Sequence, residues 1–299
     1  INGAKDGTKS VYGPTLKEIG FVETLEAAKA SSRWNSPLCE AAPGKRRGRG
    51  MASGFWFNIG GESSGATYVN EDGTITVVSG NPDIGGSRAS MGMMAAEVLG
   101  IDGKDVRTVV GDTTSVGFSF LTGGSRVTFA TGMAVTQSAE MVRDELCKRA
   151  ALLWEIPAEA VEWKDGKAYP AGDNAGKFDP LTIADIAGKS ARTGGPITGK
   201  ASINAQGAGP GYATHICDLE VDEETGHTTV LRYTAIQDVG KAIHPAYVEG
   251  QLQGGAVQGI GWALNEEYVY TKEGRLDNAG FLDYRIPVAS DLPMIETIL

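Results

Sequence analysis

The sequence predicts an α+β fold, in which antiparallel β-hairpins are followed by helices. Residues 68–78 are typical of a strand, a tight turn at Asp72-Gly73 and a second strand. The next apolar residues recur at helical spacing, at Met91, Met94, Ala95, Val98 and Leu99. Because a hairpin joins antiparallel strands, this order favours α+β over a doubly wound parallel sheet.

The N-terminal segment is expected to be irregular apart from one helix over residues 16–30. It ends in a basic run, Lys45-Arg46-Arg47-Gly48-Arg49. We interpret this run as a solvated loop, with phosphate binding as the alternative. Around the hairpin, the further elements expected are strands over 55–59 and 106–110 and a helix over 89–99 that ends at Gly100.

A longer helix is expected from shortly after Arg126 to Trp154, because apolar residues recur there at helical spacing. A small hairpin around Asp165-Gly166 follows. Residues 188–212 are rich in Gly, Ala and Ser and are expected to be a connection. The other elements expected are a helix over 181–187, a strand over 217–221, a turn over 223–226, a strand over 227–233 and a helix over 250–264.

The order of hairpin, Asp-x-Gly and helix occurs twice, about 155 residues apart, which indicates a weak internal duplication. Chance similarity of two such units is the alternative. The length of 299 residues suits about two domains. We therefore predict an entry segment over 1–49, a first half over 50–205 and a second half over 206–299.

Composition excludes several classes of protein. With 37 acidic and 27 basic residues, the net charge of −10 argues against a nucleic-acid partner. The apolar stretches are shorter than the roughly 18 residues of a membrane span, and no signal peptide is visible. The three cysteines fit no disulfide, zinc or iron–sulfur spacing, so a reducing, cytoplasmic location is expected.

Glycine is enriched, at 42 of 299 residues, about twice the usual 7%. Two identical Gly-Gly-Ser-Arg runs, Gly85–Arg88 and Gly123–Arg126, stand before expected helices, and Gly254-Gly255 through Gln258-Gly259 lie in the third helix region. A helix start offers free N–H donors, Gly lets a ligand approach, and Arg can bind phosphate oxygens through two N–H groups. The runs therefore predict a site for phosphate or pyrophosphate.

The other chemistry-bearing residues point to no catalytic group. The sequence has no Rossmann or Walker A pattern and no nucleophile elbow. His215, His227 and His244 are isolated, are expected to be structural or solvated, and have no metal-ligand spacing. Asp83 and Asp238 are explained as turn-forming, helix-capping residues. The expectation is a cofactor cradle with no catalytic residue and no metal ligand in this chain.

At these motifs the sequence resembles the molybdenum hydroxylases, the xanthine dehydrogenase and aldehyde oxidase family, in its bacterial form. The resemblance runs over nearly the whole chain from about Glu18. Its strongest stretch is Gly250–Gly261, with Asp238-Val239-Gly240 before it and Phe281–Pro287 after it. Asp83-Ile84-Gly85 and Thr122–Arg126 complete the set in the family's order.

The resemblance implies the family's molybdenum-cofactor-binding fold, made of two related α+β halves that hold molybdopterin, commonly as the cytosine dinucleotide. The residues it assigns to the cofactor are Gly85, Gly86, Ser87, Arg88, Thr122, Gly123, Gly124, Ser125, Arg126 and Gln258. In the family, backbone N–H groups of the second loop point at the pterin phosphates, and the glutamine amide binds the pterin near the metal. Phe55 and Trp56 fall where the family lines its substrate pocket; a core role is the alternative.

The resemblance also implies a reaction and partners. The family hydroxylates a carbon beside a heteroatom, or an aldehyde carbon, with oxygen from water, and passes electrons to 2Fe-2S and FAD on partner subunits or domains. The family's catalytic Glu loop and its upstream cofactor half are not found between Ile1 and Leu299. We therefore expect a fragment or split subunit that is inactive without the N-terminal half of the molybdopterin subunit. Gly86 also departs from the Gln or Thr of many members.

Two other functions fit the same residues. One is a non-redox module that binds a nucleotide or phosphometabolite with these loops. The other is a structural subunit in which the glycines serve tight turns alone. The substrate is expected to be a small N-heteroaromatic or an aldehyde.

Overall fold

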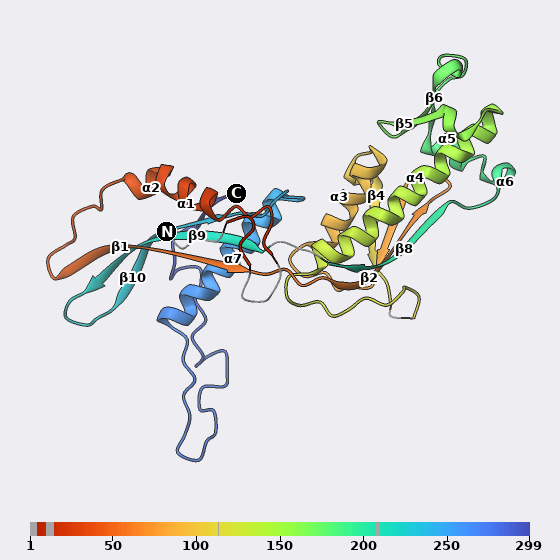
Figure 1. The fold of residues 1–299 in the computed structure, drawn as a ribbon. Coiled ribbons are helices and arrows are strands. Elements are labelled where there is room, and N and C mark those ends of the chain that lie inside the picture. The colour runs from red at the N-terminus through yellow and green to blue at the C-terminus, as the bar shows by residue number, and fades with distance from the viewer. Residues whose placement is uncertain (1–4, 10–14, 113, 207–209) are drawn as a thin grey trace. The chain divides into compact units, whose positions relative to one another are not determined.

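The computed structural model describes residues 5–9, 15–112, 114–206 and 210–299 (Figure 1). The chain divides into two compact units, which we call unit 1 (Ile1–Phe57 with Gly209–Leu299) and unit 2 (Asn58–Ala208). Each unit combines a mainly antiparallel sheet with helices. This confirms the predicted α+β class.

Unit 2 is built on a sheet in the order β4-β3-β2-β8, in which β3 is parallel to β4 and the other neighbours are antiparallel. Helices α3 and α4 lie side by side and pack on this sheet (Figure 1). Their apolar faces bury Ile75, Leu99 and Val142 in the largest core of the described residues. The bounds are β2 (Gly61–Val69), β3 (Ile75–Ser79), α3 (Ser87–Leu99), β4 (Val106–Val110), α4 (Gly132–Trp154) and β8 (Thr198–Ala205). The expected hairpin and both expected helices are thereby confirmed.

A smaller lobe follows α4. The expected hairpin around Asp165-Gly166 is confirmed, with Lys164 paired to Lys167. Trp163 donates from Nε1 to the carbonyl of Leu99 at 2.8 Å, which ties this lobe to the end of α3. Its elements are β5 (Val161–Lys164), β6 (Lys167–Pro170), β7 (Leu181–Thr182), α5 (Ile183–Ala187) and α6 (Ser190–Thr193).

The expectation that residues 188–212 form a plain connection is wrong. They contain α6, β8 and the start of β9. The small side chains that look like a linker are needed because β8 lies directly against α4. A Cβ atom on Gly199 would stand 2.0 Å from the Ser138 carbonyl oxygen.

Unit 1 is a sheet in the order β1-β9-β10-β11 with a helix on each face. On one face Ala28 of α1 packs with Ile216 and Ile236; on the other, Ala256 and Ile260 of α7 pack against Val230 and Ala235. The elements are α1 (Phe21–Ala30), α2 (Ser32–Asn35), β1 (Lys45–Trp56), β9 (Gly211–Asp222), β10 (Thr228–Gln237), α7 (Pro245–Leu264) and β11 (Glu296–Ile298).

The two sheets share one topology. The strand that precedes each hairpin in the sequence pairs with the hairpin of the other unit, so the two leading strands are exchanged. Each has a hairpin (β2-β3 or β9-β10), a helix (α3 or α7), and a strand parallel to the second hairpin strand (β4 or β11). In sequence β1 precedes β2 and β8 precedes β9, yet β1 pairs with β9 and β8 pairs with β2. The sequence boundaries predicted at 49/50 and 205/206 therefore differ from the compact units, which divide at 57/58 and 208/209. The assignment of two cofactor-binding halves stays a prediction.

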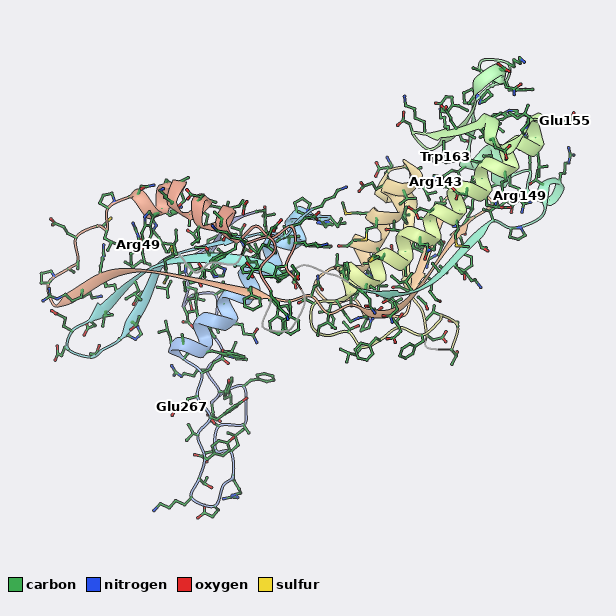
Figure 2. All side chains as sticks on the ribbon, in the orientation of Figure 1. Arg49, Arg143, Arg149, Glu155, Trp163 and Glu267 are labelled. Atoms are coloured by element: carbon green, nitrogen blue, oxygen red, sulfur yellow. The ribbon has the colours of Figure 1, made fainter. Side chains whose placement is uncertain are left out.

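The basic run is a strand, so the prediction of a solvated loop is wrong. The side chains of Lys45, Arg47 and Arg49 pair with acids on β9. Arg47 binds Glu220 at 2.8 Å, and Arg49 (labelled in Figure 2) binds both oxygens of Asp218, at 2.6 and 2.8 Å. Alternate acids on β9 and bases on β1 face each other, since β1 and β9 pair in register.

The ion pairs between β1 and β9 predict a pH dependence of stability. The hydrogen bonds from Arg49 hold the pKa of Asp218 below its ordinary value of 3.8. A carboxylate with a lowered folded-state pKa stabilises the fold above its unfolded pKa, and the contribution is lost as pH falls through the folded value. We expect Asp218→Asn to lower the free energy of unfolding by about 2 kcal/mol at pH 7. The difference from the wild type should shrink below about pH 4, as measured by urea unfolding between pH 7 and pH 3. A difference that stays constant with pH would contradict the pairing, and exposed Glu159→Gln is the control.

After α7 the chain forms a long loop that still belongs to unit 1 (Figure 1). Tyr284 donates to Glu266 at 2.7 Å and so fastens the base of this loop to the end of α7. The loop exposes large apolar side chains, among them Phe281 and Leu282. No helix in the described part of the chain is both long and apolar enough to cross a membrane.

Candidate functional site

The first Gly-Gly-Ser-Arg run forms the start of α3. Gly85 and Gly86 have φ of 64° and 78°, a left-handed backbone that favours glycine. Asp83 accepts the Arg88 N–H at 3.0 Å and pairs with the Arg88 guanidinium at 3.2 Å. This confirms the capping role expected for Asp83. The exposed Arg88 guanidinium is thus held beside a carboxylate at the helix start.

The second run forms a tight loop before α4. Gly124 and Ser125 have φ of 67° and 59°, and Arg126 returns to right-handed helical geometry. Within the described residues, the backbone N–H groups of Gly123–Arg126 have no acceptor. Where the backbone passes from left-handed to right-handed helical geometry, consecutive N–H groups form a concave anion-binding site. The loop offers the donors that a phosphate requires.

Arg126 is fully buried and does not offer its guanidinium to a ligand. It donates to the carbonyls of Gly60, Glu62, Phe120 and Leu121 at 2.7 to 3.3 Å and to Ser63 Oγ at 2.6 Å. The expectation that this side chain would bind phosphate oxygens is therefore corrected. Arg126 instead fixes the loop that carries the free N–H groups.

Asn81 joins the two loops of unit 2. It is buried, donates to Thr122 Oγ1 at 3.1 Å and accepts from Thr131 Oγ1 at 2.7 Å. It lies two residues before Asp83, so the start of α3 and the Thr122–Arg126 loop are held together. Sequence reasoning missed Asn81, whose one signal was its place at the end of an expected strand.

Gln258 lies in unit 1, on α7. Because α7 begins at Pro245, the third glycine cluster lies inside the helix and supplies no free helix-start donors. Gln258 is exposed. Cβ atoms built on the neighbouring Gly254, Gly255 and Gly259 would touch nothing within 4 Å. The backbone of this helix face is bare around the glutamine amide.

A cavity of about 220 Å³ lies in unit 1 between this face of α7 and the sheet. It is bordered by residues from β1, β9, β10 and α7: Gly54, Phe55, Trp56, Gly211, Ala213, His215, Gln237, Gln251, Leu252, Gly255 and Ala256. Gln258 follows Gln251 and Gly255 by seven and three positions, so the three share one helix face.

The two aromatic residues predicted for a substrate pocket both border this cavity. Phe55 pairs with Tyr212 across the strands, and their rings stack at 5.5 Å. Tyr212 also contacts Phe21 of α1, so the Phe55 ring lies on the opposite face of the sheet from α7. Trp56, the next residue, is turned to the α7 face and is 55% exposed. Substrate contact by either residue stays a prediction.

His215 has one ring nitrogen engaged and one buried without a partner. Its Nδ1 lies 2.9 Å from the Tyr233 hydroxyl, whereas Nε2 has no hydrogen-bond partner in the described structure. Burial lowers the pKa of His215 and raises that of Tyr233, so both groups are neutral near pH 7. His244 is the N-cap of α7 and stacks on Tyr247, as expected for a structural residue. The described residues contain no cluster of metal ligands.

Residues 23–293 match a family model described as a molybdopterin cofactor-binding domain. The chain is 29% identical to the putative xanthine dehydrogenase molybdenum-binding subunit XdhA of Escherichia coli K12, over 99% of this chain and 41% of that protein. It is also 29% identical to the nicotine 6-hydroxylase large subunit of Paenarthrobacter nicotinovorans, over 95% of this chain and 38% of that protein. The chain thus spans about two fifths of the length of these relatives.

The fold is similar to that of solved structures. Quinoline 2-oxidoreductase from Pseudomonas putida 86 matches with a TM-score of 0.82 and 23% identity, over 97% of this chain and 40% of that one. A Cu,Mo-CO dehydrogenase matches with a TM-score of 0.77 and 21% identity, over 93% and 36%.

Proposed function

We propose that this chain, which belongs to the molybdopterin cofactor-binding domain family of the molybdenum hydroxylases, forms part of an enzyme that hydroxylates a small N-heteroaromatic or aldehyde. The oxygen comes from water, and electrons pass to 2Fe-2S and FAD partners. Because the chain spans about two fifths of its relatives, the N-terminal half of the molybdopterin subunit completes the site. The molybdenum cofactor supplies the redox chemistry when bound.

The run of unpartnered N–H groups at Gly123–Arg126 carries this proposal. Such a run suits a phosphate or pyrophosphate, which a cofactor in the cytosine dinucleotide form contains. Arg126 holds the loop rigid from beneath, so the donors are in place before the anion arrives. Gln258, with bare helix backbone around it, suits the flat part of the same cofactor.

The first loop supports the proposal less strongly. At Gly85–Arg88 the Asp83 carboxylate already accepts a helix-start N–H and pairs with Arg88. A carboxylate at that point opposes a second anion. We propose that Gly85 and Gly86 bring backbone close to the ligand there, with Ser87 and Arg88 at its edge.

A charge substitution at Ser125 tests the phosphate site. Asp and Asn have nearly the same shape and both tolerate the left-handed backbone at this position. In the complex of this chain with its partners, we expect Ser125→Asp to lower molybdenum and pterin content at least tenfold, because its carboxylate opposes the phosphate. Ser125→Asn, the matched control, should keep both near the wild-type level. Metal analysis and fluorescence of the oxidised pterin measure the result.

Two outcomes would contradict the proposal. Equal cofactor content in both variants would mean that no phosphate of the cofactor binds at this loop. A metal-free wild-type complex that binds a plain nucleotide tightly would instead favour the non-redox binding module.

A further inference from the structure

The long loop after α7, residues 265–295, carries two neighbouring side chains that unit 1 does not pack. Phe281 is 95% exposed and Leu282 is 97% exposed, the highest values among large apolar side chains in the described residues. Single apolar residues are common at a protein surface, whereas a contiguous apolar patch marks an interaction site. We call Phe281 and Leu282 the exposed pair.

The exposed pair is held on a closed turn. The backbone N–H groups of Asp283 and Tyr284 both donate to the carbonyl of Gly280, at 3.1 and 2.9 Å. Phe281 and Leu282 are the two residues directly after Gly280, so both lie within this turn. The backbone of the exposed pair is therefore ordered although its side chains contribute no burial to the fold.

The turn is fastened to the end of α7. Besides its hydrogen bond to Glu266, Tyr284 contacts the ring of Tyr268, with 5.5 Å between the ring centroids. Pro287 also lies against α7, since a Cβ atom on Gly261 would stand 2.7 Å from its Cδ atom. An element that is already ordered loses less entropy when it binds, so this arrangement suits a docking element.

The rest of the loop adds apolar surface to the exposed pair. Its other large apolar side chains that are at least half exposed are Tyr268, Tyr270, Ile286, Val288 and Met294. Tyr270 forms a β-bridge with Leu276, and Asn278 Nδ2 donates to the carbonyl of Glu267 at 2.6 Å (Glu267 is labelled in Figure 2), so this part of the loop is a closed hairpin. Aromatic residues are enriched at the cores of protein–protein interfaces, and the loop has such a composition.

We infer that the exposed pair anchors this chain to the N-terminal half of the molybdopterin subunit, by inserting into an apolar pocket of that half. The inference rests on the proposed function, which supplies that half. The match to the family model runs from residue 23 to residue 293 and so includes nearly all of the loop. About three fifths of the Escherichia coli relative lies outside the region matched by this chain. Because the loop belongs to the shared domain, its cover is expected in the same subunit.

Charge argues against a second copy of this chain as the partner. The loop contains six acidic and three basic residues, and the whole chain has a net charge of −10. Asp277 and Asp283 are both exposed close to the exposed pair in sequence. A symmetric contact through this loop would bring like charges together. The pocket in the N-terminal half is expected to be apolar, with basic residues at its rim.

Photocrosslinking in the assembled complex identifies what covers the exposed pair. Phe281 is replaced by p-benzoylphenylalanine, and the crosslinked peptides are identified by mass spectrometry after irradiation. We expect these peptides to come from the N-terminal half of the molybdopterin subunit. Crosslinks to a second copy, or to the 2Fe-2S or FAD partner, overturn the inference.

Leu152 on α4 is the control position for the crosslinking. It is 62% exposed and stands between Lys148 and Glu155 on one helix face, as on a solvated surface. The yield of crosslinks from position 281 should exceed that from position 152 at least tenfold. Equal yields overturn the inference.

Polar substitution measures what the exposed pair contributes to assembly. We expect Phe281→Ser combined with Leu282→Ser to lower the fraction of this chain recovered in the complex at least tenfold. The midpoint of urea unfolding of the chain should not change, because the two side chains are exposed in unit 1. Leu152→Ser is the control in both measurements. Unchanged recovery overturns the inference, and so does a lower midpoint, which would mean that the exposed pair packs within unit 1.

The inference and the proposed function fail in different ways. A molybdenum-loaded complex in which position 281 crosslinks elsewhere overturns the inference alone. A complex without molybdenum in which position 281 still crosslinks to the N-terminal half overturns the proposed function alone.

Discussion

Replacing Arg126 by Met should lower the free energy of unfolding of unit 2 by about 3–5 kcal/mol, the largest effect expected for any side chain in the proposed site. Its buried guanidinium satisfies the carbonyls of Gly60, Glu62 and Phe120, which Met would leave in the interior without donors. In the described structure no carboxylate forms an ion pair with this charge. The loop that carries the free N–H groups should loosen, and cofactor content should fall with stability.

The chain offers a matched control for this experiment. Arg88 ends the identical tetrapeptide at the other loop, but its side chain is 56% exposed and pairs with Asp83. Arg88→Met should cost below about 1 kcal/mol, as for other exposed ion pairs. Urea unfolding of both variants measures the contrast. Similar losses would mean that Arg126 is not the residue that organises the loop.

Substituting Gly199 by Ala should destabilise unit 2 by about 3 kcal/mol through steric overlap. The added methyl group would stand 2.0 Å from the Ser138 carbonyl oxygen, so α4 would have to move away from β8. The atoms nearest to the added methyl group are not the ends of flexible side chains, so the strain is hard to relieve. We expect a lower midpoint of urea unfolding with little change in its slope.

Gly50→Ala is the control for this substitution. Gly50 also lies in a strand, β1, and a Cβ atom there would meet nothing within 4 Å. The variant should be as stable as the wild type or slightly more stable, because Ala restricts the unfolded chain. A comparable loss at both positions would show that strand propensity, and not the contact with α4, sets the cost.

Local patterns predicted the fold class, both main hairpins and the long helices, because these depend on side-chain periodicity within short windows. They could not distinguish Arg88 from Arg126. The two tetrapeptides are identical, and the difference arises from carbonyls at Gly60 and Glu62, more than sixty positions before Arg126. Burial of a charge by distant backbone leaves no local sequence signal.

The exchange of leading strands was also beyond local reasoning, although one signal for it exists. Asp218, Glu220 and Asp222 alternate along β9, and Lys45, Arg47 and Arg49 alternate along β1. In the antiparallel register each base faces an acid, so two complementary charge patterns indicated the pairing. The cavity between α7 and the sheet arises from three strands and a helix and could be found in the structure alone.

The exchanged strands also set the order in which the molecule can be completed during synthesis. Unit 2 lies within one continuous segment and can close once β8 has left the ribosome. Trp56 of β1 pairs with Gly211, so β1 emerges roughly 10–30 s before its partner at typical translation rates. An unpaired strand of this length invites aggregation, and closely spaced positive charges discourage it. The basic run that pairs with β9 in the finished protein therefore also discourages aggregation of β1 in the nascent chain until β9 has been synthesised.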